Sequence, residues 1–252
     1  MVRALTSVVF CVILSSFNVY AIQLPPEIHK CDRTAPDFNE CMVKSIGEAT
    51  RYFSKGSKDF GYPVLSPFRI ERLEINGEPG KSVTLNQKYD NVVMYGMTES
   101  TVKSFSLKDD GGVCLWELVI HTPYTRMEAD YQMTGQILVF PINGHGRCNV
   151  TLTGIVNKHT ADCEHYTKKG KSHMKLKNYK MDMSTEGAYF DFENIFPGNE
   201  QISKEVGKTI NENSQEVFND VKQGFEKILA ELHQNAANSV FSKIPENELF
   251  VK

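Results

Sequence analysis

One short stretch of the sequence concentrates residues that could bind a metal ion. The segment 159–165 reads HTADCEH and contains His159, Cys163 and His165. Imidazole and thiolate groups are the usual ligands of structural zinc sites, which have four ligands, and no fourth ligand is apparent beside these three. We therefore expect a charged hairpin loop in this segment and no metal site.

Other signatures of catalysis are weak or missing. The segment GHG, with Gly144 and Gly146, is not followed by the Lys-Ser/Thr pair of a P-loop and joins two expected strands, so we expect a turn there. The sequence has no G-x-S-x-G elbow and no H-E-x-x-H motif, and its carboxylates are scattered. We expect neither an enzyme nor a cofactor. A lipid-processing enzyme, with an acid–base pair assembled by the fold, is the alternative.

The N-terminus predicts export from the cell. Arg3 precedes the apolar run ALTSVVFCVILSSF, and the sequence VYA ends at Ala21. This pattern is typical of a secretory signal peptide over residues 1–21. The run is shorter than the ~20 apolar residues that span a bilayer, which argues against a membrane anchor. We expect residues 22–252 to form a single soluble extracellular domain and to be monomeric.

Secretion changes the interpretation of the cysteines, because disulfides persist in oxidising compartments. The expected mature chain keeps five cysteines, namely Cys31, Cys41, Cys114, Cys148 and Cys163. An odd number allows at most two disulfides within the chain. Cys31 and Cys41 are close in sequence and flank a turn-like segment, so they are our first choice for a pair. A second pair among the other three is open.

Composition excludes one large class of partner. The 252-residue chain has 23% charged residues and a formal net charge of −3, whereas nucleic-acid-binding domains usually carry a basic excess. We expect no nucleic-acid partner. One segment is locally basic, with Lys168, Lys169, Lys171, Lys175 and Lys177. A solvated face is the plain interpretation, and contact with an anionic membrane surface is the functional alternative.

Hydrophobic periodicity divides the chain into three parts. Residues 36–55 show helical spacing. From about 62 to 196, about nine strands with short connections are separated by Gly, Pro, Asn and Asp, which predicts a meandering antiparallel sheet. Residues 199–242 carry an apolar stripe that predicts one long helix, bent at Gly224.

Alternation within the strands gives the sheet one polar and one apolar face. In VCLWELVIH, the side chains of Trp116, Leu118 and Ile120 share a face. In CNVTLTGIV, the apolar Val150 and Leu152 are on one face of the strand and Asn149 is on the other. The apolar stripe of the long helix is the simplest partner for the apolar face. A strongly curved sheet would have to wrap around this helix, and the wrap would leave an apolar channel.

The order of these elements resembles a known family. Two cysteines precede a short helix, followed by FSKGSKDFGYPVLSPFRIERLEI, NVVMYGMTESTVKSF and ADYQMTGQILVFPINGHG, and the chain ends in a long helix and VFSKIPENELF. The chain resembles the takeout and haemolymph juvenile-hormone-binding family of arthropods over essentially the whole mature sequence. The resemblance implies an α+β fold in which a curved antiparallel sheet wraps a long C-terminal helix and encloses a hydrophobic tunnel. Bactericidal/permeability-increasing proteins and group 7 mite allergens share this architecture.

The resemblance also implies particular features. Cys31 and Cys41 match the family's N-terminal disulfide, whereas the second bridge of hormone-binding members is absent because no cysteine follows Cys163. We expect a carrier of a small hydrophobic lipid or terpenoid ligand, with a membrane- or lipid-surface-interacting protein as the alternative. Asn149, in the sequon Asn149-Val150-Thr151, is a candidate glycosylation site. Candidate residues lining the tunnel are Trp116, Leu118, Ile120, Met133, Ile137, Val150, Leu152 and Phe225.

Overall fold

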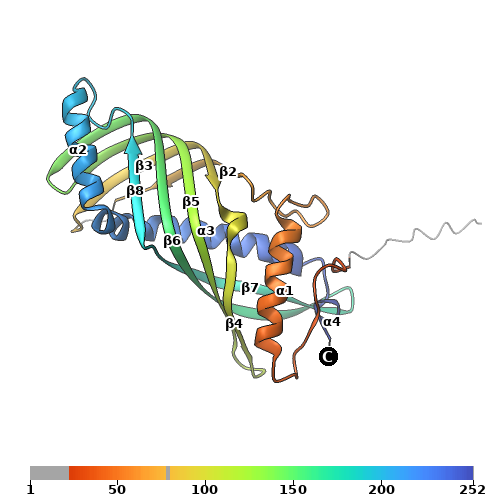
Figure 1. Cartoon of the computed structure of the whole chain (residues 1–252). Helices are drawn as coiled ribbons and strands as arrows, with labels where there is room; N and C mark the ends of the chain where they lie inside the picture. Colours follow the sequence, from red (N-terminus) through yellow and green to blue (C-terminus); the bar gives the residue numbers. More distant parts are fainter. Residues whose placement is uncertain (1–22, 78–79, 252) are drawn as a thin grey trace, which may run out of the picture.

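A computed structural model describes residues 23–77 and 80–251, and the predicted signal peptide over residues 1–21 lies outside the described residues. The helices are α1 (Phe38–Phe53), a 3-10 turn η1 (Met97–Glu99), α2 (Glu200–Glu212), α3 (Ser214–Phe241) and α4 (Glu246–Leu249). The strands are β1 (Cys31–Asp32), β2 (Phe68–Ile75), β3 (Val83–Tyr95), β4 (Thr101–Asp109), β5 (Cys114–Ile137), β6 (Phe140–Lys168), β7 (Lys171–Ser184), β8 (Gly187–Phe192) and β9 (Phe250–Val251). The expected α+β class, with a large antiparallel sheet and a long C-terminal helix, is confirmed (Figure 1).

Two very long strands carry the sheet. Strands β5, with 24 residues, and β6, with 29, pair along almost their full lengths, from Leu115 opposite Asp162 to Ile137 opposite Phe140. Each long strand pairs with two further strands in succession: along the chain, β5 pairs first with β4 and then with β3, and β6 pairs first with β8 and then with β7. Pro123 lies where β5 changes partner, a place where its missing N–H breaks no ladder. The resulting sheet curves around α3 (Figure 1).

This arrangement corrects two predictions made from the sequence. The segment GHG is no turn, because Gly144 and Gly146 lie within β6 opposite Met133 and Tyr131. The turn between β5 and β6 consists of Leu138 and Val139. A Cβ atom at Gly144 would come within 2.9 Å of the Cα of Ile195, so glycine serves close backbone approach there. The segment HTADCEH is no hairpin loop, since it also lies inside β6, paired with both β5 and β7.

The predicted single C-terminal helix is in fact two helices. The break lies at Asn213, between α2 and α3, and Figure 1 shows the two helices meeting at a steep angle. The Asn213 side chain donates a hydrogen bond from Nδ2 to the Thr209 carbonyl at 2.8 Å, which is the competition with the backbone that favours asparagine at helix ends. The helix is not interrupted at Gly224, which lies in the middle of α3.

Gly224 serves packing between α3 and β2. A Cβ atom added there would overlap the Ile75 side chain, whereas one added at Gly207 in α2 would meet nothing within 4 Å. We expect Gly224→Ala to destabilise the protein by roughly 1–3 kcal/mol through overpacking. Gly207→Ala is the matched control and should stabilise by up to about 1 kcal/mol, because alanine is the better helix former. Chemical denaturation of both variants measures the difference, and equal effects of the two substitutions would contradict the packing role of Gly224.

Two disulfides anchor the strands at one end of the molecule. Cys31 and Cys41 join β1 to α1, and Cys114 and Cys163 join β5 to β6, with Cα–Cα distances of 5.8 and 5.0 Å. Cys148 is a buried free thiol, and burial raises its pKa to about 12. The second disulfide resolves the pairing that the sequence left open.

The Cys31–Cys41 disulfide yields a stability prediction. Its loop is short, so replacing both cysteines by serine should lower the free energy of unfolding by about 2.5–3 kcal/mol in the chain-entropy account. The sheet and α3 should still form, because neither depends on this link, and ligand affinity should fall because α1 would be less well held. Circular dichroism melts and a probe titration test both parts. Loss of the whole fold in the double variant, or an unchanged melting temperature, would contradict this account.

Candidate ligand-binding cavity

A cavity of about 340 Å³ lies between α3 and the concave face of the sheet. Its wall is mainly apolar and comes from elements far apart in the sequence. Helix α1 and the segment after it contribute Ile46, Ala49, Thr50, Phe53, Tyr62, Pro63 and Leu65, while α3 contributes a row from Phe218 to Phe241. Strands β5, β6 and β7 contribute the floor. At ~1.5 Å per residue, the row on α3 extends over roughly 35 Å, so the cavity is elongated along the helix.

Six of the eight candidate lining residues face this cavity. These are Trp116, Leu118 and Ile120 on β5, Val150 and Leu152 on β6, and Phe225 on α3. Met133 and Ile137 do not line it. Both side chains are 1% exposed and pack in the core with Val206 and Ile210 of α2. The predicted inward orientation of these two side chains on β5 is correct, but at this end of the sheet close packing fills the inner face and leaves no cavity.

The lining residues on α1 were absent from the candidate set. Ile46, Ala49 and Phe53 lie on the apolar stripe that predicted this helix, so the stripe was the signal that could have identified them. Helix α1 packs over β4 through Phe38 and Phe105, whose ring centroids are 6.2 Å apart. Helical periodicity by itself does not distinguish a stripe that covers a core from one that covers a cavity, because both need the same apolar positions.

The three residues of HTADCEH lie in three different environments. His159 is fully buried and lines the cavity, Cys163 forms the disulfide with Cys114, and His165 lies in an ion-pair network. The group Asp109, Cys114 and His165 brings three metal-ligand types within 4.8 Å. Because Cys114 is oxidised in the disulfide, its sulfur is not available as a thiolate ligand.

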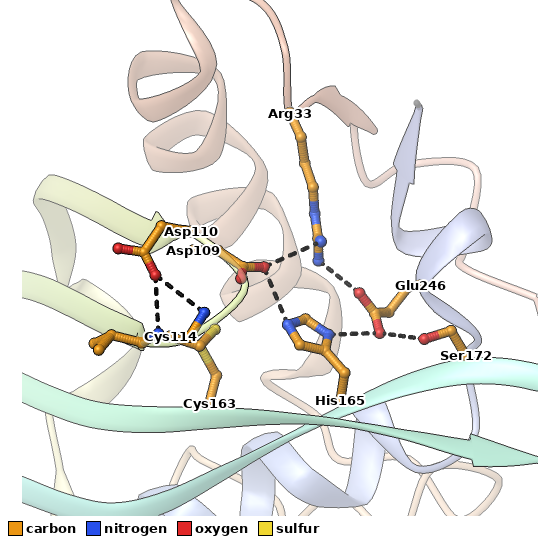
Figure 2. Close-up of polar contacts among 10 residues, drawn as sticks. Arg33, Asp109, Asp110, Cys114, Cys163, His165, Ser172 and Glu246 are labelled. Carbon is orange, nitrogen blue, oxygen red and sulfur yellow. Dashed lines mark hydrogen bonds and ion pairs between the residues drawn. A yellow bond between two sulfur atoms is a disulfide. The ribbon is translucent and has the colours of Figure 1, made fainter.

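The ion-pair network joins Arg33, before α1, and Glu246, in α4, to the sheet (Figure 2). Glu246, at the start of α4, accepts bonds from Arg33 at 2.9 Å, Ser172 at 2.7 Å and His165 Nδ1 at 2.8 Å. Asp109 contacts His165 Nε2 at 3.0 Å on the other side of the ring. Burial by itself would raise the pKa of Glu246, but the bonds from His165 and Ser172 and the charge of Arg33 outweigh it, and the pKa is lowered. The network therefore closes this end of the molecule beside the disulfides.

Two histidines and a tyrosine form the main polar cluster in the cavity wall. His159 Nδ1 lies 3.1 Å from the Tyr179 hydroxyl, and His233 Nδ1 donates to the Leu229 carbonyl at 2.7 Å. The two imidazole centroids are 5.1 Å apart. Burial, with a smaller effect from His233, lowers the pKa of His159 to about 3. Burial also lowers the pKa of His233 and raises that of Tyr179, so all three groups are uncharged at neutral pH.

One lysine paired with two carboxylates completes the wall. Lys222 on α3 contacts Asp182 at 2.8 Å and Glu226 at 3.3 Å, and it donates to the Met183 carbonyl at 2.8 Å. Glu226 is buried and accepts a bond from the Met183 N–H at 2.7 Å. These contacts fasten α3 to β7. Burial by itself would lower the pKa of Lys222, but Asp182 and Glu226 raise it, so the ammonium stays charged and paired.

This protein is therefore an α+β protein in which a strongly curved antiparallel sheet wraps a long helix around an elongated apolar cavity. The sequence profile of the haemolymph juvenile hormone binding protein (JHBP) family matches residues 7–251, and the chain belongs to this family. The family predicted from the order of elements is thereby confirmed.

Individual relatives are distant in sequence. The circadian clock-controlled protein daywake of Drosophila yakuba is 22% identical over 216 residues, covering 83% of each chain, and that of Drosophila melanogaster is 21% identical over 218 residues, covering 84% of each. The crystal structure of Takeout 1 from Epiphyas postvittana superposes with a TM-score of 0.78 at 20% identity, covering 89% of this chain and all of that one. The likeness to Takeout 1 confirms the fold.

Proposed function

We propose that this protein is a secreted carrier that binds one small hydrophobic ligand, such as a terpenoid or another lipid, in the cavity beneath α3. The observation that carries this proposal is the apolar cavity of about 340 Å³. Protein interiors are close-packed and rarely leave voids of this size, whereas ligand pockets begin at about 300 Å³ and are lined mainly by apolar side chains. Membership of the JHBP family supports the same class of ligand.

Secretion is part of the proposal. The leader over residues 1–21 has the pattern of a signal peptide, and the two disulfides suit an oxidising compartment. No helix in the described ranges 23–77 and 80–251 has the length and apolar character that crossing a bilayer requires. Mass spectrometry of the protein recovered from the medium of insect cells should show an N-terminus at Ile22, and retention of residues 1–21 would contradict export by cleavage.

The carrier function is tested by ligand uptake. Protein stripped of lipid should bind a fluorescent fatty acid or terpenoid with one-to-one stoichiometry, and hydrophobic competitors should displace it. Native mass spectrometry of the protein as purified should show an added mass that organic extraction removes. If no apolar probe binds to correctly folded, stripped protein, the carrier function is wrong.

A second candidate function is contact with an anionic membrane surface. The hairpin between β6 and β7 presents the exposed Lys169 and Lys171, while Lys168 donates to the Ser242 carbonyl and both Lys175 and Lys177 contact Glu164. Co-sedimentation with vesicles of phosphatidylserine that fades with added salt would support this function. Lipid exchange without any vesicle binding favours the soluble carrier.

Asn149 is the proposed glycosylation site. It lies on β6 opposite Glu128 of β5 and Asp191 of β8, on the face of the sheet turned away from the cavity. The glycan would leave the cavity unobstructed. Enzymatic removal of N-glycans should lower the mass of the secreted protein, and Asn149→Gln should abolish that change.

A further inference from the structure

The polar cluster in the cavity has capacity for hydrogen bonds that the protein does not use. His159 is 0% exposed, and its Nε2 has no hydrogen-bond partner among the described residues. The side-chain Oδ1 of Asn157, two residues earlier on the same strand, is also buried and without a partner. Both residues line the cavity. Buried polar atoms in native proteins nearly always have a partner, so two orphans on one wall of a cavity point to a ligand that supplies the missing bonds.

The imidazole of His159 is held in place for this role. Its Nδ1 is engaged by the Tyr179 hydroxyl at 3.1 Å, and the ring lies in contact with the rings of Tyr179 and His233, at centroid distances of 5.7 and 5.1 Å. If the tyrosine donates to Nδ1, the proton of the neutral ring is on Nε2, which then donates to a ligand oxygen. If the tyrosine accepts, Nε2 is an acceptor for a ligand hydroxyl. In both cases the partner is an oxygen group of the ligand.

The charges around the cavity argue against an anionic ligand. Lys222 is the one cationic side chain among the described residues that line it, and Asp182 and Glu226 already neutralise it. A carboxylate in this cavity would leave water without gaining a countercharge, which is strongly unfavourable. The imidazoles cannot readily supply that charge, because burial holds both in the neutral form.

We infer that Asn157, His159 and Tyr179 form a subsite for an uncharged oxygen function of the ligand, a hydroxyl or carbonyl, and that the cavity selects neutral lipids over free fatty acids. This inference rests on the proposed carrier function. Along α3, His233 is 15 residues from Phe218 but 8 from Phe241. The oxygen function would thus bind nearer the α1 end, with the longer apolar part of the ligand extending toward Phe218.

Displacement of a fluorescent terpenoid probe by two matched competitors tests the inference. Dodecan-1-ol and dodecanoic acid share one chain, and the acid is ionised at pH 7.5. For the unaltered mature protein, we expect the alcohol to compete at a concentration at least tenfold lower than the acid. His159→Phe keeps an aromatic ring but removes both nitrogens. It should weaken the binding of the alcohol at least fivefold while changing the affinity for a hydrocarbon probe by less than twofold.

Two further variants separate the subsite from general damage. Tyr179→Phe removes only the hydroxyl that orients the imidazole, so it should also weaken the binding of the alcohol. This variant replaces His159→Phe in the test if His159→Phe fails to fold. Tyr189→Phe removes the same hydroxyl from a tyrosine that is 57% exposed and does not line the cavity, so it should leave the preference unchanged. Equal affinity for acid and alcohol in the unaltered protein, or equal weakening of alcohol and hydrocarbon probe by His159→Phe, would overturn the inference while leaving the carrier function intact. If neither competitor nor probe binds, the carrier function itself fails.

Discussion

Replacing Val150 by tryptophan is expected to weaken the binding of a hydrophobic probe by roughly tenfold to thirtyfold. Val150 lies on β6 with its side chain in the cavity wall, and the larger indole would occupy space that the ligand needs. Displacing two to three methylene groups of ligand, at ~0.8 kcal/mol each, removes about 2 kcal/mol of binding free energy. Fluorescence titration of stripped protein measures the change.

The same substitution six residues along the strand gives the matched control. Val156 lies on the opposite face of β6 and is 38% exposed, so Val156→Trp should change the affinity by less than twofold. Circular dichroism should show both variants folded. Similar affinities for the Val150→Trp and Val156→Trp variants would show that the ligand does not occupy this cavity.

The buried His159 is expected to make the protein acid-sensitive. The unfolded chain takes up a proton at His159 near its ordinary pKa of 6.5, whereas the folded protein resists until about 3. Between these two pH values the unfolded state binds more protons, so stability is fully present above pH 6.5 and falls as the pH falls toward 3. At about 1.4 kcal/mol per pKa unit, the loss from this group is up to about 5 kcal/mol.

Denaturant unfolding of the His159→Gln variant at several pH values measures this contribution. The loss of stability between pH 7 and pH 4 should be smaller by a few kcal/mol in the variant than in the unaltered protein. Carboxylates such as Glu246 also lose stabilising contacts in acid, but they are common to both proteins and cancel in the comparison. His145→Gln, at an exposed position on the same strand, is the control. Parallel stability curves for the unaltered protein and His159→Gln would contradict the buried, neutral state of His159.

Local sequence patterns were sufficient for the faces and the class of the fold. Strand β2 begins and ends where the alternating run FRIERLEI does, and the inward positions of Trp116, Leu118 and Ile120 follow from the period of two. Helix α1 falls within the predicted range 36–55. These features depend on side chains a few residues apart, whose periodicity is set by the backbone geometry of strand and helix.

Tertiary structure decided where the strands and the long helix end. The polar residues of HTADCEH and the glycines of GHG are typical of loops, yet both segments lie in β6. Backbone hydrogen bonds to β5 hold both segments in the sheet, and HTADCEH is also paired with β7. The break at Asn213 rather than Gly224 arises from packing: α2 packs against β8 through Asn211, which bonds both backbone groups of Phe190, while Gly224 lies against Ile75. None of these partners is near in sequence.

The sequence by itself determined that one apolar sheet face and one apolar helix stripe must meet, in a chain whose order of elements resembles the JHBP family. Only the tertiary structure decided where the helices pack closely against the sheet and where a cavity separates them. Met133 and Val150 have the same inward orientation on adjacent strands, but Met133 packs beside α2 whereas Val150 faces open space beneath α3. The difference lies in the distance between helix and sheet, which depends on the curvature of the whole sheet and on no single side chain.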